Sequence, residues 1–282
     1  METRRRLLVL MTPPTVWLVV LFILPLILMA VFSFRAGSFA PERDQFTFDT
    51  YREYFSNPAY LRRLAESGWV ALQTSLLSIL FAYPLAYFLA FRAGPMRVTL
   101  LTILIVPAWT SYLLRILAWK IILGSNGALA TFLLSIGVMQ EAAPVLLYSP
   151  AAVIITLVYS WIPFVTLPIF SALERIDKRL LEAAADLGCA PWEAFLRVTF
   201  PLSLPGVIGG FFFVFIPTLG EWVTPALVGG TYRMYGNSIQ EQFVRALDWP
   251  MGSLMSLVML AVVLLLTALF SRVGRISDLA GA

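Results

Sequence analysis

The chain has 282 residues, of which 60% are hydrophobic and only 13% are charged, and its formal net charge is +4. This composition is too apolar for the surface of a soluble domain and indicates a polytopic membrane protein. The lack of histidine and the presence of a single cysteine, Cys189, argue against metal sites, disulfide frameworks and catalytic triads.

The positive net charge does not have the pattern of a nucleic-acid-binding surface. No basic patch with interleaved aromatic residues occurs, and short loops between apolar stretches account for much of the excess. We therefore interpret the charge as a sign of membrane topology and expect no nucleic-acid partner.

Six apolar stretches are each long enough to cross a bilayer, which takes roughly 20 residues. They cover residues 16–34, 68–91, 98–123, 151–173, 204–227 and 251–271. The first follows a run of arginines, as in a signal peptide, but it is too long and lacks a convincing cleavage site, so we expect it to remain as an anchor. The predicted fold class is an all-α polytopic membrane protein with six transmembrane helices in a single domain over residues 1–282.

An even number of spans places both termini on the same side of the membrane. The loops on that side are richer in Lys and Arg than the opposite loops; their basic residues are Arg4, Arg5, Arg6, Arg92, Arg97, Arg175, Lys178, Arg179, Arg197, Arg272 and Arg275. Because basic residues accumulate in cytoplasmic loops, both termini are predicted to be cytoplasmic. The same assignment places the loop 174–203 in the cytoplasm.

The segment 35–66, between the first two spans, is predicted to lie outside the membrane. Within it Asn57 can cap a helix that begins at Pro58 and carries Tyr60, Leu61 and Leu64 on one face. We expect this helix to lie along the outer surface, where it either covers the bundle or contacts an external partner.

Glu221 is a carboxylate that falls inside or near the end of the fifth span. A carboxylate at that depth is costly, so it normally faces a polar cavity, pairs with a base or marks a substrate path. Two interpretations stay open. Glu221 lines the path of a cationic substrate, or it forms a structural ion pair with Arg115 or Lys120 of the third span.

Several aromatic residues accompany these charges in the third and fourth spans. They could line a path that holds an organic cation against the faces of their rings, or they could belong to the aromatic belt at the membrane interface. The residues are Trp109, Tyr112, Trp119, Tyr159 and Trp161. Only in combination with Glu221 do they favour a cationic substrate.

The stretch 182–201, with the sequence EAAADLGCAPWEAFLRVTFP, is polar and helix-prone although it lies between apolar runs. Strong helix formers begin at Glu182, Gly188 is a natural helix stop, and Pro191 suits the first position of a second helix. We therefore predict a short helix, a turn and a second helix. The alanine-rich face lets another surface approach closely and Glu182 supplies a charge, so the stretch is interpreted as a docking element.

The spacing of this stretch resembles the signature loop of the membrane subunits of binding-protein-dependent ATP-binding-cassette importers. The residues that match the family pattern are Glu182, Ala183, Ala184, Gly188 and Pro201, and the conservative replacements are Val198 and Phe200. Further segments, including YPLAYFLA, VPAWTSYLLRILAWKIILGSNG and LGEWVTPALVGG, look like the spermidine/putrescine permease branch of the family.

The resemblance implies a type I importer permease fold in the bacterial inner membrane, in which the loop 174–203 is a coupling helix that docks on an ATPase. It further implies a polyamine substrate, such as spermidine or putrescine, delivered by a periplasmic solute-binding protein. A second homologous permease, forming a heterodimer, and two ATPase subunits would complete the importer, with membrane lipid around it. ATP and Mg²⁺ would belong to the ATPase, and this chain would bind no cofactor or metal and carry no catalytic residue.

The identity of the substrate stays open at this stage. The same architecture could carry another organic cation, an amino-acid-like compound, or an anion favoured by Arg115 and Lys120. A stand-alone secondary transporter is a further alternative, although the sequence shows no internal repeat of the kind common in such carriers.

Overall fold

The computed structural model describes residues 2–141 and 143–280, with side chains from Leu10 to Leu269. Throughout this part of the chain the regular structure is helical, apart from an isolated antiparallel bridge between Arg35 and Phe46. The side chains of five arginines used in the topology prediction lie outside the described part: Arg4, Arg5, Arg6, Arg272 and Arg275.

Five helices of the described chain are long and apolar enough to cross a membrane. They are α1 (Glu2–Ser33), α3 (Pro58–Phe91), α7 (Pro150–Glu174), α10 (Phe200–Leu219) with the helical turns that precede it from Pro191, and α13 (Trp249–Ala280). A sixth crossing results if α4 (Arg97–Ile105), η3 (Val106–Trp109) and α5 (Tyr112–Ile122) form one bent span. Shorter helices outside the candidate site include η1 (Glu42–Asp44), α2 (Asp49–Ser56), η2 (Gly94–Met96), α6 (Ala128–Ser135), α12 (Tyr235–Glu241) and η5 (Gln242–Ala246).

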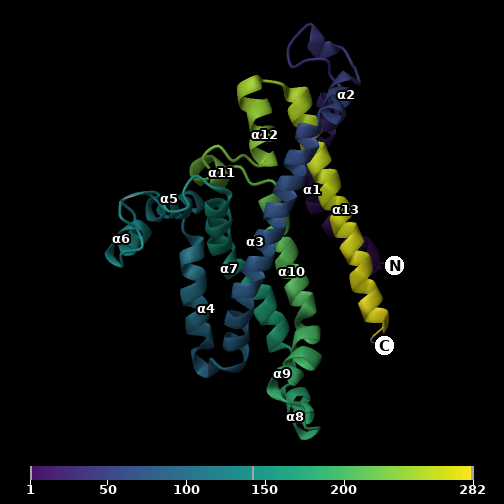
Figure 1. Ribbon diagram of the computed structural model, residues 1–282. Coiled ribbons are helices and arrows are strands. Elements are labelled where there is room, and N and C mark those ends of the chain that lie inside the picture. Colours follow the sequence, from purple (N-terminus) through teal and green to yellow (C-terminus); the bar gives the residue numbers. More distant parts are fainter. Residues whose placement is uncertain (1, 142, 281–282) are drawn as a thin grey trace. The chain divides into compact units, whose positions relative to one another are not determined.

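The third expected span, 98–123, contains a sharp bend. The axes of the helical segments before and after the break differ by 89°. Pro107 lacks a backbone donor, and Thr110 and Ser111 have extended ψ angles of 158° and 129°. Because these residues interrupt the helical hydrogen bonds, α5 turns away from α4 (Figure 1).

The fifth expected span, 204–227, contains two helices. α10 ends at Leu219, and a separate helix, α11 (Val223–Val228), follows. The carboxylate of Glu221 accepts hydrogen bonds from the first N–H groups of α11, so a new helix starts there instead of the old one continuing.

The helix expected on the outer surface is part of the second span. Asn57 caps it as predicted, since its Oδ1 accepts a hydrogen bond from the Ala59 N–H at 3.0 Å. The expectation of a separate surface helix is wrong, because α3 runs without a break from Pro58 to Phe91. No proline interrupts residues 59–83, and a single glycine, Gly68, does not end a helix that packing supports.

The chain forms two compact units, Met1–Arg62 with Ser238–Arg272, and Arg63–Asn237 with Val273–Ala282. In the first unit Phe32 packs against Trp249, with ring centres 5.6 Å apart, and the Trp249 N–H donates to Ser38 Oγ at 2.8 Å. The segment after α1 is thus tied to the start of α13. Whether residues 1–282 act as a single domain stays a prediction.

In the second unit α7 and α10 pack closely through glycine. A Cβ placed on Gly206 would lie only 2.5 Å from the Pro168 carbonyl oxygen and 2.6 Å from Ala172 Cβ. Gly210, one turn later, faces Val165. Small residues at this spacing let membrane helices approach each other closely. α3 joins the pair through a buried hydrogen bond of 2.8 Å between the hydroxyl groups of Tyr83 and Ser203.

We expect Gly206→Ala to destabilise the protein, because the added methyl group meets backbone that has to move, at a cost of about 1–3 kcal/mol for overpacking. Gly209→Ala on the same helix is the matched control, since a Cβ there meets nothing within 4 Å. Thermal unfolding of the detergent-purified protein should show a lower Tm for Gly206→Ala only. Equal Tm values for the two variants would contradict close packing at Gly206.

Candidate functional site

The stretch between α7 and α10 has the predicted form of helix, turn and helix. α8 (Lys178–Asp186) begins after Asp177, whose Oδ1 accepts from the Arg179 N–H at 3.0 Å. Gly188 has φ +83°, in the left-handed region that favours glycine, and α9 (Pro191–Ala194) begins at Pro191. The local structure is therefore confirmed, whereas its docking role stays a prediction.

The residues predicted for docking divide between surface and interior. Glu182, Ala183 and Gly188 are exposed, whereas Ala184 is buried beneath them. Pro201 is exposed too, but it lies in the first turn of α10, beyond the short helices. Two large apolar side chains that the sequence prediction did not include are exposed in the same segment: Leu187, at 85%, and Trp192, at 64%. The docking segment, by which we mean residues 178–194 of α8, the turn and α9, thus presents apolar surface beside a carboxylate.

Aromatic contacts join the docking segment to the membrane helices. The π-helical turn η4 (Phe195–Thr199) connects α9 to α10. In this turn Phe195 contacts the rings of Tyr83 and Tyr87 on α3, with centres 5.7 Å and 6.0 Å apart. Sequence reasoning missed these three residues, because nothing in their local pattern shows that distant aromatic side chains meet. Figure 1 shows α8 and α9 at one end of α7 and α10, with α11 near the opposite end.

Glu221 lies at that opposite end, directly after α10, and both of its carboxylate oxygens accept hydrogen bonds. Oε1 accepts from the N–H groups of Val223 at 2.8 Å and Thr224 at 3.0 Å. Oε2 accepts from the Tyr112 hydroxyl at 2.8 Å, and that hydroxyl is also 2.9 Å from the Thr224 hydroxyl. A carboxylate at a helix N-terminus is stabilised by free N–H groups and by the helix dipole. Glu221 therefore links α5 to α11.

The ion pair considered for Glu221 is not formed in the structure. Among the ion pairs of the described side chains, none joins Glu221 to Arg115 or Lys120. Arg115 instead donates from Nη1 to the Ser160 carbonyl at 3.3 Å, and its guanidinium lies 5.7 Å from the centre of the Tyr112 ring. The partners of the Glu221 carboxylate are therefore two backbone N–H groups and the Tyr112 hydroxyl, and not a basic side chain.

The predicted aromatic residues do not gather in one lining. Tyr112 contacts Glu221, but Tyr159 pairs with Trp119, with ring centres 5.4 Å apart. Trp161 packs against Phe164 and Phe213. Trp109 lies at the end of η3, and its side chain is 81% exposed.

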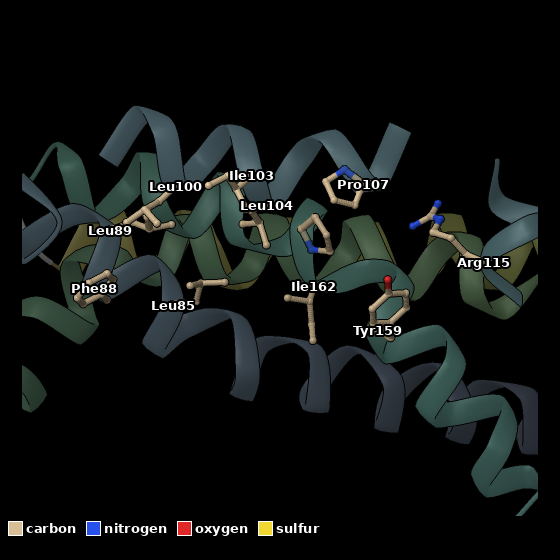
Figure 2. A pocket seen from close by; sticks show the side chains of 12 residues that line it. Leu85, Phe88, Leu89, Leu100, Ile103, Leu104, Pro107, Arg115, Tyr159 and Ile162 are labelled. Atoms are coloured by element: carbon tan, nitrogen blue, oxygen red, sulfur yellow. The ribbon is translucent and has the colours of Figure 1, made fainter. Parts of the chain in front are cut away.

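A cavity of about 400 Å³ lies in the second unit. Side chains from α3, α4, η3, α5 and α7 line it, and nearly all of them are apolar. Figure 2 shows the two polar exceptions, Arg115 and Tyr159, at one end of the row of lining residues. Of the residues predicted for a substrate path, only Tyr159 lines this cavity.

Comparison with known sequences places nearly the whole chain in one family. Residues 3–279 match the family described as binding-protein-dependent transport system inner membrane component. The spermidine/putrescine transport system permease protein PotB of Escherichia coli (strain K12) is 38% identical over 262 residues, which cover 92% of this chain and 94% of that protein. PotB of Haemophilus influenzae is 35% identical over 266 residues, covering 92% and 91%.

Solved structures match the fold over a similar length. A bacterial alginate ABC transporter, solved in complex with an alginate pentasaccharide-bound periplasmic protein, contains a chain that matches with a TM-score of 0.69 and 20% identity over 96% of both chains. The MetNI methionine ABC transporter matches with a TM-score of 0.57 and 17% identity, over 76% of this chain and 94% of that chain. At these identities the matches show the fold alone, which is that of ABC importer permeases.

Proposed function

Because the chain belongs to the family of binding-protein-dependent transport system inner membrane components, we propose that it is the permease subunit of an ATP-driven importer for polyamines such as spermidine or putrescine. The observation that carries this proposal is the 38% identity to a spermidine/putrescine permease across 92% of the chain. The protein is a multi-pass inner membrane protein and a transport subunit. Both termini and the loop 174–203 face the cytoplasm in this proposal, as the distribution of Lys and Arg favours.

The proposed importer needs several partners besides this chain. A second, homologous permease would form the other half of the path as a heterodimer, and a periplasmic solute-binding protein would deliver the substrate. Two ATPase subunits would hold ATP and Mg²⁺ and hydrolyse the nucleotide. This chain would then contribute the path and a docking surface, not a catalytic residue.

Docking on the ATPase is proposed for the segment that contains Glu182, Ala183, Ala184 and Gly188. Its exposed apolar side chains and its single turn at Gly188 support this role, because they offer a firm surface to a partner. Movement of the ATPase would displace α8 and α9, and Phe195 would pass that displacement to α3. Rigid-body movement of closely packed helices is one route to alternating access.

The substrate path is proposed to pass Glu221, with Tyr112 beside it. The carboxylate accepts hydrogen bonds but has no cationic partner among the described residues, so no side chain of this chain competes with a polyamine for it. Dehydration of the cation opposes this attraction, so one carboxylate cannot set the affinity alone. Roles for Trp109, Tyr159 and Trp161 in the path stay predictions.

An anionic solute is the second candidate for the same importer. Arg115 favours it, since this cation lies at the end of the cavity and has no carboxylate partner among the described residues. The two candidates differ in the charge of the solute, which a transport assay distinguishes directly.

The substrate proposal predicts ATP-dependent uptake of spermidine. The complete importer, reconstituted in liposomes with its binding protein, should take up radiolabelled spermidine, and unlabelled putrescine should compete with it. A dicarboxylate in equal excess should leave spermidine uptake unchanged. Uptake of the dicarboxylate without uptake of spermidine would support the anionic alternative and overturn the polyamine proposal.

The docking proposal predicts that Glu182→Lys and Gly188→Val separate ATP hydrolysis from transport. Charge reversal weakens the contact with the ATPase, and valine at φ +83° strains the turn by roughly 1–2 kcal/mol. We expect at least a tenfold lower ratio of solute imported to ATP hydrolysed, with normal amounts of protein in the membrane. Glu141→Lys, at an exposed position outside the segment, is the charge-matched control. Undiminished transport by both variants would argue against docking at this segment.

The path proposal predicts that Glu221→Gln lowers uptake by about tenfold, the size expected when a hydrogen-bonded charge is lost. Glutamine keeps one oxygen that can accept from the N–H groups of Val223 and Thr224, so α11 should remain capped. The comparison variant Tyr112→Phe removes a hydrogen bond but keeps the charge, so it should mainly lower the Tm. Equal losses of assembly and uptake in Glu221→Gln would instead assign Glu221 a structural role.

A further inference from the structure

The cavity between α3, α4 and α7 has the shape and lining of a site for an apolar chain. Leu85, Phe88 and Leu89 come from α3, and further aliphatic side chains come from α4. Figure 2 shows these side chains in a row that ends at Arg115 and Tyr159. The volume of about 400 Å³ lies within the roughly 300–1,000 Å³ usual for small-molecule sites. One end therefore suits a polar head and the rest an apolar tail.

Several N–H groups of the Arg115 guanidinium have no hydrogen-bond acceptor among the described residues. Nη1 makes one hydrogen bond, at 3.3 Å, to the Ser160 carbonyl. Nε is buried and has no acceptor among the described residues. A buried donor without an acceptor costs about 1–3 kcal/mol, and more when it carries charge. The carboxylate of Glu221 does not fill this need, because its oxygens bind Tyr112 and the start of α11. An anion in the cavity would accept from the Nη groups of the guanidinium, which make only the one bond to Ser160 within the described part of the chain.

The cavity opens along the side of membrane-spanning helices. Ile103 and Phe88, which line it, are 63% and 47% exposed. An apolar side chain exposed on a spanning helix faces lipid or another protein, so the bilayer itself can supply the occupant. A cationic substrate is disfavoured, because Arg115 would repel it.

We propose that this cavity binds an anionic phospholipid of the surrounding membrane. One acyl chain lies between α3, α4 and α7, and the phosphate accepts hydrogen bonds from Arg115 and from the hydroxyl of Tyr159. A guanidinium is well suited to phosphate, since its planar donors match two phosphate oxygens. The proposal assigns Arg115 to the lipid, so it competes with the anionic-solute alternative, in which Arg115 would face the solute.

The bound lipid would also brace the bend between η3 and α5. Pro107 and Ala108 line the cavity before the bend, and Arg115 lines it after the bend. A lipid that contacts both sides holds the two helical segments at their angle of 89°. The same lipid would keep the cavity closed to solute.

Native mass spectrometry of the delipidated importer can test the proposal by titration with dioleoylphosphatidylglycerol, which is anionic, and dioleoylphosphatidylcholine, which is zwitterionic. Wild type should bind one phosphatidylglycerol at least tenfold more tightly than Arg115→Met, since a charged hydrogen bond is lost. Lys120→Met removes a charge from the same helix outside the cavity lining and should bind like wild type. Equal affinities for Arg115→Met and Lys120→Met would overturn the proposal.

A second pair of variants tests the acyl-chain position without touching the charge. Ile103→Trp fills the cavity from an exposed position and should weaken phosphatidylglycerol binding about tenfold. Val98→Trp, on the same helix, 65% exposed and outside the lining, should not. If Ile103→Trp prevents association with the second permease and leaves lipid binding unchanged, the groove is a protein interface and the lipid proposal is wrong.

Discussion

The close contact between Gly206 of α10 and the Pro168 carbonyl of α7 is the constraint on which the arrangement of the second unit depends. Lipid offers little hydrophobic force between helices, so association depends on close packing, and a glycine provides it. The docking segment leaves α7 and enters α10, while Glu221 follows the far end of α10. One packed helix pair thus carries both candidate regions at opposite ends, so a movement imposed on one end would be passed along the pair to the other.

The environment of Glu221 shows how a membrane protein can retain a charged group without an ion pair. Two backbone N–H groups and one hydroxyl donate to the carboxylate, and these donors are neutral, so no cation offsets its formal charge. An arginine partner would have removed that charge from any interaction with a solute. The same hydrogen bonds divide the fifth apolar stretch into α10 and α11, so the break in the helix and the charged site have one cause.

Opposite charges occupy different surroundings in the second unit. Glu221 lies in a polar cluster with Tyr112 and Thr224, whereas Arg115 lies at the end of an apolar cavity. A polyamine fits the first environment, and an anionic amphiphile fits the second. Under the two proposals, lipid phosphate is the partner of Arg115 and the solute is the partner of Glu221, although both residues contact Tyr112.

The sequence by itself determined the features that depend on local chemistry. These are the apolar helices, the cap at Asn57, and the helix, turn and helix around Gly188, because a cap, a stop and a run of apolar residues act within a few positions of the chain. Only the tertiary structure decided which distant side chain and carbonyl meet Glu221 and Arg115, and that a cavity lies beside Arg115. Their partners are distant in sequence: Tyr112 and Glu221 are 109 residues apart, and Arg115 and Ser160 are 45 apart. The sequence shows that a charged residue in an apolar span needs hydrogen-bond partners. Which groups become those partners depends on how the helices pack.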